Sequence, residues 1–183
     1  ARHGKCVVRL KGGDPCIFGR GGEEAQWLRE QGVEVELVNG ITAGLAGATQ
    51  CDIPLTLRGV ARGVTLVTAH TQDDSQVNWQ ALAQSGTTLV VYMGVAKLSE
   101  IREQLLAGGM MADMPVAMIE NASLPHQREC RSDLTAMEKD AQAFELKSPA
   151  ILVIGRVAAS SAAQPSRPEN VWEPGLPAIQ TAR

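Results

Sequence analysis

A glycine-rich segment near the start of the chain carries the residues best suited to bind a small molecule. It reads RLKGGDPCIFGRGGEE from Arg9 to Glu24 and follows an apolar run. Glycines let a ligand approach the backbone because they have no Cβ, and Asp14 can accept hydrogen bonds from hydroxyl or ammonium groups. Loops beyond the carboxyl ends of parallel strands commonly bind ligands in α/β sheets. The segment therefore predicts a ligand loop, although a Gly-Gly-Asp-Pro turn is also an ordinary turn.

The same glycines do not form a common nucleotide-binding motif. A G-x-G-x-x-G fingerprint that began at Gly19 would need glycine at position 24, where the chain has Glu24. The phosphate-binding pattern G-x-x-x-x-G-K-[ST] does not occur in the sequence. A Rossmann fingerprint and a P-loop are therefore excluded.

The cysteines and histidines are not arranged as metal ligands. They lie far apart, without a C-x-x-C pair: Cys6, Cys16, Cys51 and Cys130, and His3, His70 and His126. A structural zinc site needs ligands at short, paired spacing, so we expect no metal. A chain of this length has little need of disulfides, and reduced thiols indicate a cytoplasmic protein.

The elements that must position the ligand loop alternate between strand and helix. Strands are predicted at residues 5–10 and 33–38, and helices at residues 23–31 and 41–50. This alternation predicts a parallel α/β layer. The pattern lapses between residues 53 and 63, so we place the end of a first lobe at residue 62.

A second α/β lobe is predicted over residues 63–158. Its expected strands are 64–68, 88–93, 116–120, 127–131 and 150–155, and its expected helices are 79–85, 98–106 and 134–144. Two short strands in succession around residues 116–131 favour a mixed sheet. Residues 159–183 contain four prolines and no periodicity, which predicts a disordered tail; alternatively, Trp172 makes a short docking contact there.

Composition limits the classes of partner. A net charge of -3 gives no general attraction to nucleic acid or to an anionic membrane. No apolar stretch approaches the ~20 residues that span a bilayer, and no signal peptide is recognisable. Aromatic residues make up 3% of the chain, so the core is expected to be aliphatic.

The string GGDPxIFGRGGEE resembles the signature of the uroporphyrinogen-III C-methyltransferases, a branch of the tetrapyrrole methylases found alone or as the C-terminal half of siroheme synthase. Further segments match in the same order over residues 7–157: GITAGLAGATQCDIPLTLRGVA, VVYMGV, DMPVAMIENAS and SPAILVIGRV. The chain departs from the family pattern at Asn39, Leu57 and Ala122, where proline, histidine and glycine are usual. The resemblance implies a two-lobed α/β fold, with a parallel sheet in the first lobe and a mixed sheet in the second.

The resemblance also implies the site. S-adenosylmethionine would lie between the lobes, in contact with Gly12, Gly13, Asp14, Ile17, Thr42, Ala43, Met93 and Ala122. Without the resemblance, Met93 would be a core residue and Thr42 a helix cap. No metal is implied.

The implied reaction is the methylation of uroporphyrinogen III to precorrin-2 in siroheme and cobalamin biosynthesis, with release of S-adenosylhomocysteine. An electron-rich pyrrole carbon would attack the sulfonium methyl, so the enzyme would act by orientation and by excluding water. The substrate is polyanionic, and basic residues that could bind it are expected to cluster in or beside the predicted loops: Arg9, Lys11, Arg20, Arg58 and Arg62. Arg20, which glycines flank, is the preferred candidate.

Two alternatives stay open, a sister methyltransferase acting on a later corrin precursor and a non-catalytic S-adenosylmethionine-binding module. The chain opens at Ala1 almost directly onto a predicted strand, which suggests an N-terminal truncation. By resemblance the catalytic residues would lie upstream of Ala1, so we expect this chain to be inactive alone. The full-length protein is expected to be a cytoplasmic homodimer.

Overall fold

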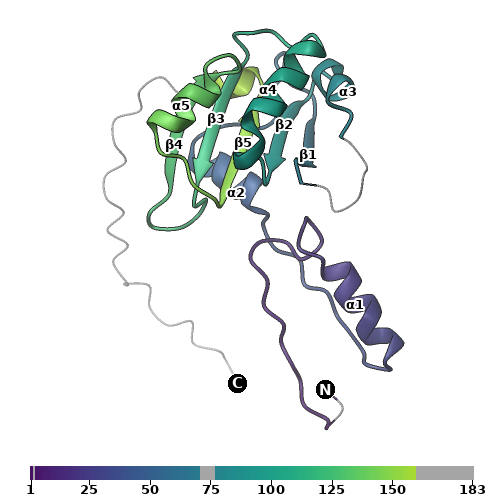
Figure 1. The fold of residues 1–183 in the computed structure, drawn as a ribbon. Helices are drawn as coiled ribbons and strands as arrows, with labels where there is room; N and C mark the ends of the chain where they lie inside the picture. The colour runs from purple at the N-terminus through teal and green to yellow at the C-terminus, as the bar shows by residue number, and fades with distance from the viewer. Residues whose placement is uncertain (2, 71–76, 160–183) are drawn as a thin grey trace.

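A computed structural model describes residues 1, 3–70 and 77–159 (Figure 1). In chain order its elements are α1 (Gly21–Glu30), α2 (Ala43–Gln50), β1 (Val64–Thr68), α3 (Trp79–Gln84), β2 (Thr88–Tyr92), the 3-10 helix η1 (Val95–Lys97), α4 (Leu98–Ala107), β3 (Pro115–Glu120), β4 (Arg128–Asp133), α5 (Met137–Ala143), β5 (Ala150–Ile154) and the 3-10 helix η2 (Arg156–Ala159).

The second lobe is built on one mixed five-stranded sheet. The strand order is β1-β2-β5-β3-β4, and only β1 and β2 are parallel. Every predicted strand and helix of residues 63–158 is present, with ends that move by a few residues at most. The prediction of a mixed sheet in this lobe is therefore confirmed.

Alternation along the strands gives the sheet two buried faces, because successive side chains point to opposite sides. One face packs against α3, α4 and α5, and its buried side chains include Leu89, Val91 and Leu152. The other face packs against α2, and its buried side chains include Val90, Tyr92, Ile119 and Val153. In Figure 1, α4 and α5 lie over the front of the sheet, while α2 lies below and behind it.

The two strands predicted in the first lobe do not form. Residues 1 and 3–62 contain no strand, only an isolated β-bridge between Leu57 and Ala61. A strand needs a neighbouring strand to complete its backbone hydrogen bonds, and no described segment pairs with residues 5–10 or 33–38. Their apolar side chains are consequently open to solvent, with Val8 75% and Val38 72% exposed. The predicted parallel sheet of this lobe is therefore corrected to two unpaired segments.

The predicted helices of the first lobe are present as α1 and α2. Figure 1 shows α1 standing away from the sheet, with α2 between the two parts. Ala48 of α2 and Cys51, the C-cap that follows it, pack on the sheet, so this part of the chain connects the first lobe to the sheet. The division of the chain at residue 62 stays a prediction.

The predicted tail and Trp172 lie outside the described residues, except for Ala159, which ends η2. Within the described ranges, no helix combines the length and the apolar character that crossing a membrane requires. The same ranges contain no group of three histidine, cysteine or acidic side chains placed to hold a metal ion.

Candidate functional site

Asp14 fixes the glycine-rich loop. Its Oδ1 accepts a hydrogen bond from the backbone N–H of Cys16 at 2.8 Å, and its Oδ2 accepts one from the N–H of Gly40 at 3.2 Å. The second bond joins the loop to the segment that leads into α2. A carboxylate oxygen has two acceptor sites, so Asp14 can hold the loop and still accept a hydrogen bond from a ligand.

The glycines of the loop have different structural roles. At Gly19 and Gly21 a Cβ would lie 2.7 and 2.6 Å from the carbonyl oxygen of Pro15, so glycine is needed for the loop to close in front of α1. At Gly12 no atom lies within 4 Å of the Cβ position. The expectation that glycines leave room for a ligand therefore applies to Gly12, whereas Gly19 and Gly21 serve the packing of the loop itself.

The start of α2 lies directly against this loop. Gly13 adopts φ +78, and a Cβ there would be 3.3 Å from the carbonyl oxygen of Ile41 and 3.4 Å from Cα of Thr42. Gly40 would place a Cβ onto the carbonyl oxygen of Gly13. The structure thus brings the loop at Gly13 and Asp14 beside the start of α2 at Thr42 and Ala43.

Thr42 stands at the N-cap position of α2 but its side chain does not cap the helix. Its Oγ1 lies 2.7 Å from the hydroxyl of Tyr92 on β2. The same hydroxyl accepts a hydrogen bond from the backbone N–H of Gly44 at 3.0 Å. Tyr92 therefore supplies, from another element, the acceptor that an N-cap side chain usually provides.

Small residues let α2 approach the sheet closely. A Cβ at Gly44 would lie 2.5 Å from both the Tyr92 hydroxyl and Cγ1 of Val90, and one at Gly47 would lie 2.9 Å from Cβ of Ala122. Ala122 stands in the turn after β3 and packs, half-buried, against the α2 face of the sheet. Thr42, Ala43 and Ala122 are consequently held on one side of the sheet.

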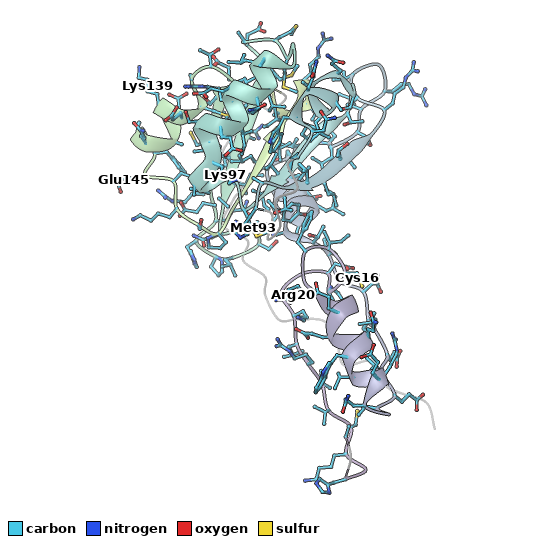
Figure 2. The ribbon with its side chains drawn as sticks, turned by 45° about the vertical axis from the view of Figure 1, so that its right-hand side comes forward. Cys16, Arg20, Met93, Lys97, Lys139 and Glu145 are labelled. Carbon is cyan, nitrogen blue, oxygen red and sulfur yellow. The ribbon has the colours of Figure 1, made fainter. Side chains whose placement is uncertain are left out.

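Met93 follows β2 in a left-handed conformation. Its φ is +55, which is uncommon for a residue with a side chain, and it is 50% exposed. Met93 is thus not a core residue. Figure 2 places it at the edge of the sheet that faces the part of the first lobe carrying Cys16 and Arg20.

Two contacts connect the glycine-rich loop to this edge of the sheet. The rings of Phe18 and Tyr92 lie with centroids 4.7 Å apart, and Ile17 packs against the apolar cluster that contains Tyr92. Three segments that are distant in sequence therefore meet around Tyr92: the loop, the start of α2, and the turn at Met93. This junction is our candidate site.

The basic side chains predicted to bind the substrate do not all lie at this junction. Arg20 pairs with Glu23 at 2.7 Å at the surface, and this hydrogen bond raises the pKa of Arg20. Lys11 donates to the carbonyl oxygen of Gly19 at 2.8 Å and also bonds Glu24, which lowers the pKa of Glu24. Lys11 therefore joins the loop to α1.

Arg62 does not belong to the junction. It lines a cavity of about 410 Å³ together with Gly63 and Thr87, which directly precede β1 and β2. Met93 lies at the opposite, carboxyl end of β2. Because five strand residues span roughly 16 Å, the expected grouping of Arg62 with the other basic residues is wrong.

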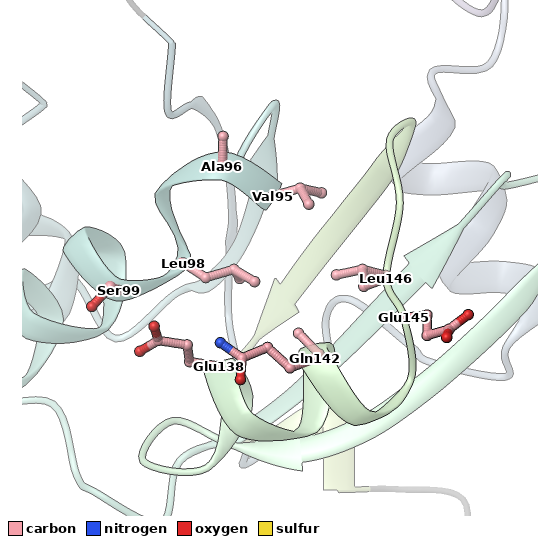
Figure 3. A pocket seen from close by; sticks show the side chains of 9 residues that line it. Val95, Ala96, Leu98, Ser99, Glu138, Gln142, Glu145 and Leu146 are labelled. Carbon is pink, nitrogen blue, oxygen red and sulfur yellow. The ribbon is translucent and has the colours of Figure 1, made fainter.

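A second cavity, of about 280 Å³, opens between α4 and α5 (Figure 3). Its lining combines apolar side chains such as Leu98 and Leu146 with Ser99, Glu138 and Glu145. None of the eight predicted cofactor residues lines this cavity or the one at Arg62.

The sequence of this chain matches the model of a known protein family. The family model of the tetrapyrrole (corrin/porphyrin) methylases matches residues 1–138. The chain belongs to the tetrapyrrole methylase family. The match includes the glycine-rich loop, α2, Met93 and Ala122, so the predicted α/β fold class of the tetrapyrrole methylases is confirmed, except for the parallel sheet of the first lobe.

Named relatives of this tetrapyrrole methylase point to one branch. The chain is 79% identical to a uroporphyrinogen-III C-methyltransferase of Pseudomonas fluorescens over 84% of its length and 62% of that protein. It is 70% identical to the one of Pseudomonas aeruginosa, over 90% of the chain and 67% of that protein. The chain thus spans about two thirds of the length of these relatives.

A solved structure agrees with the sequence relatives. It is the uroporphyrin-III C-methyl transferase from Thermus thermophilus complexed with S-adenosylhomocysteine. The match has a TM-score of 0.73 and 38% identity, and it covers 86% of this chain and 69% of the other.

Sequence reasoning about this tetrapyrrole methylase missed Tyr92 and Phe18. Tyr92 lies in an apolar strand, where an aromatic residue is typical of core. Only the position of Tyr92 beside the predicted Met93 could have drawn notice to it. Phe18 lies within the recognised motif but carries no polar group that would mark it.

Proposed function

We propose that this tetrapyrrole methylase transfers methyl groups from S-adenosylmethionine to uroporphyrinogen III. The observation that supports this most strongly is the junction around Tyr92, which unites the predicted cofactor residues from three separate segments. The names of the Pseudomonas relatives and the S-adenosylhomocysteine in the Thermus thermophilus structure support the choice of reaction and cofactor.

The residues at the junction fit S-adenosylmethionine. Gly12 leaves open space beside the backbone, and Ala43 is small and only partly buried, so a purine or a ribose has room. Asp14 can accept a hydrogen bond from an ammonium or hydroxyl group. The half-exposed thioether of Met93 is a flexible, polarisable surface suited to a bound aromatic ring.

The chain would promote the reaction by orientation. When bound, the cofactor supplies an electrophilic methyl group on a sulfonium ion. The backbone of the glycine-rich loop and the turn at Met93 would hold that ligand, while Ile17 and Phe18 would keep water away. Fixing two reactants in the right geometry can supply roughly 7–11 kcal/mol of the barrier reduction.

Arg20 is the proposed contact for the substrate carboxylates. The Arg20 side chain is 65% exposed, and that of its partner Glu23 is 66% exposed. Because such a surface pair contributes at most about 1 kcal/mol, Arg20 can exchange Glu23 for a carboxylate of uroporphyrinogen III at little cost. Arginine suits this role because it binds carboxylates through two parallel hydrogen bonds.

The proposal extends to assembly and location. The homodimer that the family resemblance implies is part of this proposal. All four cysteines are free thiols, which favours a reducing compartment and hence the cytoplasm. The division into lobes at residues 1–62 and 63–158 is proposed with them.

The direct test is methyl transfer by a completed protein, meaning this chain joined to the part of the Pseudomonas aeruginosa relative that it does not cover. We expect label from S-adenosylmethionine to appear in uroporphyrinogen III. Transfer only to a later corrin precursor would favour the sister methyltransferase. Binding of S-adenosylhomocysteine without any transfer would favour a binding module.

A further inference from the structure

Tyr92 is the side chain through which the sheet contacts the start of α2. It is 7% exposed at the carboxyl end of β2, immediately before Met93. Its hydroxyl reaches two groups of the α2 N-terminus, the hydroxyl of Thr42 and the N–H of Gly44. Its ring contacts Phe18 of the glycine-rich loop.

The contact between Tyr92 and the start of α2 has more hydrogen-bond donors than hydrogen bonds. Three protons are available, on the Gly44 N–H, the Tyr92 hydroxyl and the Thr42 hydroxyl, while two bonds are made. Gly44 donates to Tyr92, and the two hydroxyls share one bond. One hydroxyl proton is therefore left without an acceptor among the described residues.

Acidity indicates which proton is left over. A phenol is a stronger acid than an aliphatic alcohol and hence the better hydrogen-bond donor. We infer that the shared hydrogen bond runs from Tyr92 to Thr42, because the phenol is the better donor and its oxygen already accepts from Gly44. The Thr42 hydroxyl proton is then free to be donated elsewhere.

The far end of α2 is held as well. Arg131 on β4 donates to the carbonyl oxygen of Cys51, the C-cap of α2, at 2.9 Å, and to the carbonyl oxygen of Ala158 at 2.6 Å. With both ends of the helix fixed to the sheet, removing the Tyr92 hydroxyl acts on the N-terminus alone.

We propose that Tyr92 is a positioning residue: it orients Thr42 to donate a hydrogen bond to bound S-adenosylmethionine and fixes the start of α2 relative to Met93. This inference rests on the proposed function. It assigns Tyr92 no contact with the reacting atoms, since the hydroxyl acts through Thr42 and Gly44.

The test is a double-mutant cycle in the completed protein, with the dissociation constant of S-adenosylhomocysteine measured by calorimetry. Tyr92→Phe keeps the ring and the Phe18 contact and removes only the hydroxyl. We expect Tyr92→Phe and Thr42→Val each to raise the dissociation constant about tenfold, and the double variant also about tenfold, because the two residues act as one unit.

The matched control is Thr88→Val. It removes another hydroxyl from the same strand, one that is buried without a hydrogen-bond partner among the described residues. We expect this variant to leave the dissociation constant unchanged. A roughly hundredfold loss in the double variant, or no loss in Tyr92→Phe, would overturn the proposal.

A second measurement needs no ligand. In the 183-residue chain, amide hydrogen exchange at Gly44 should become at least tenfold faster in Tyr92→Phe and stay unchanged in Thr88→Val. Unchanged exchange at Gly44 in Tyr92→Phe would overturn the proposal. If the completed protein itself does not bind S-adenosylhomocysteine, the proposed function fails, and the exchange at Gly44 still decides whether Tyr92 positions α2.

Discussion

Replacing Gly44 by alanine tests the packing that builds the candidate site. The added Cβ would lie 2.5 Å from the Tyr92 hydroxyl and 2.5 Å from Cγ1 of Val90. Both neighbours are buried, at 7% and 0% exposure, so neither can move into solvent. The start of α2 would have to shift away from β2.

The magnitude follows from three opposing contributions. Overpacking a core costs about 1–3 kcal/mol, and an unmade bond between the Gly44 N–H and Tyr92 costs about 1–3 kcal/mol more. Alanine gains about 1 kcal/mol over glycine in a helix. We therefore expect Gly44→Ala to lower the free energy of unfolding by about 3 kcal/mol, within a range of about 1–5 kcal/mol.

Urea unfolding followed by circular dichroism measures this change. The control is Gly22→Ala in α1, where no atom lies within 4 Å of the Cβ position; the stability should rise by up to about 1 kcal/mol. If Gly44→Ala leaves the unfolding free energy within about 0.5 kcal/mol of the parent, the close contact between α2 and β2 is refuted.

Three further predictions concern single side chains. Asp14→Ala in the completed protein should weaken S-adenosylhomocysteine binding by about 1–3 kcal/mol in calorimetry; unchanged affinity would remove Asp14 from the site. Bonds from Arg128 and from the N–H of Lys147 lower the pKa of Glu120 below its usual 4.5, so its stabilisation is present above that pH and is lost as the pH falls through the lowered value. Below pH 4.5, the free energy of unfolding should therefore fall less steeply with falling pH in Glu120→Gln than in the parent protein. Equal slopes for the two proteins would contradict this. Burial raises the pKa of the Cys51 thiol to about 12, so a thiol reagent should modify exposed Cys6 and Cys16 long before Cys51, and equal rates would disprove it.

The second lobe could be predicted well because its strands carry their own signal. β2, β3 and β5 are continuous apolar runs bounded by turns, and each is buried on both faces. β4 is polar, RECRSD, and stands at the end of the strand order, where one edge is unpaired. The strand was nevertheless predicted, at residues 127–131.

The first lobe could be predicted only in part because periodicity does not reveal the partner of a strand. Residues 33–38 alternate like a strand, yet strand formation depends on a neighbour elsewhere in space. Helices complete their hydrogen bonds internally, which is why α1 and α2 were found.

The candidate site divides in the same way. Gly12, Gly13 and Asp14 could be predicted as a ligand loop because their motif is contiguous, while their contact with the cofactor, like that of Met93 and Ala122, is a prediction from the resemblance. Tyr92 was missed because its role depends on Thr42 and Gly44, 50 and 48 residues away. Arg62 was wrongly grouped with the basic residues of the loops because the sequence does not show at which end of the strands a residue lies. It precedes β1, whereas Met93 follows β2 at the opposite end of the two parallel strands.

A crystal structure of the completed protein with S-adenosylhomocysteine tests the central claim most directly. The claim is that the glycine-rich loop, the start of α2 and the turn at Met93 form one cofactor site around Tyr92. We expect the ligand to contact Gly12–Ile17, Thr42 and Met93. A ligand seated in the cavity between α4 and α5, against Leu98 and Glu138, would contradict the claim.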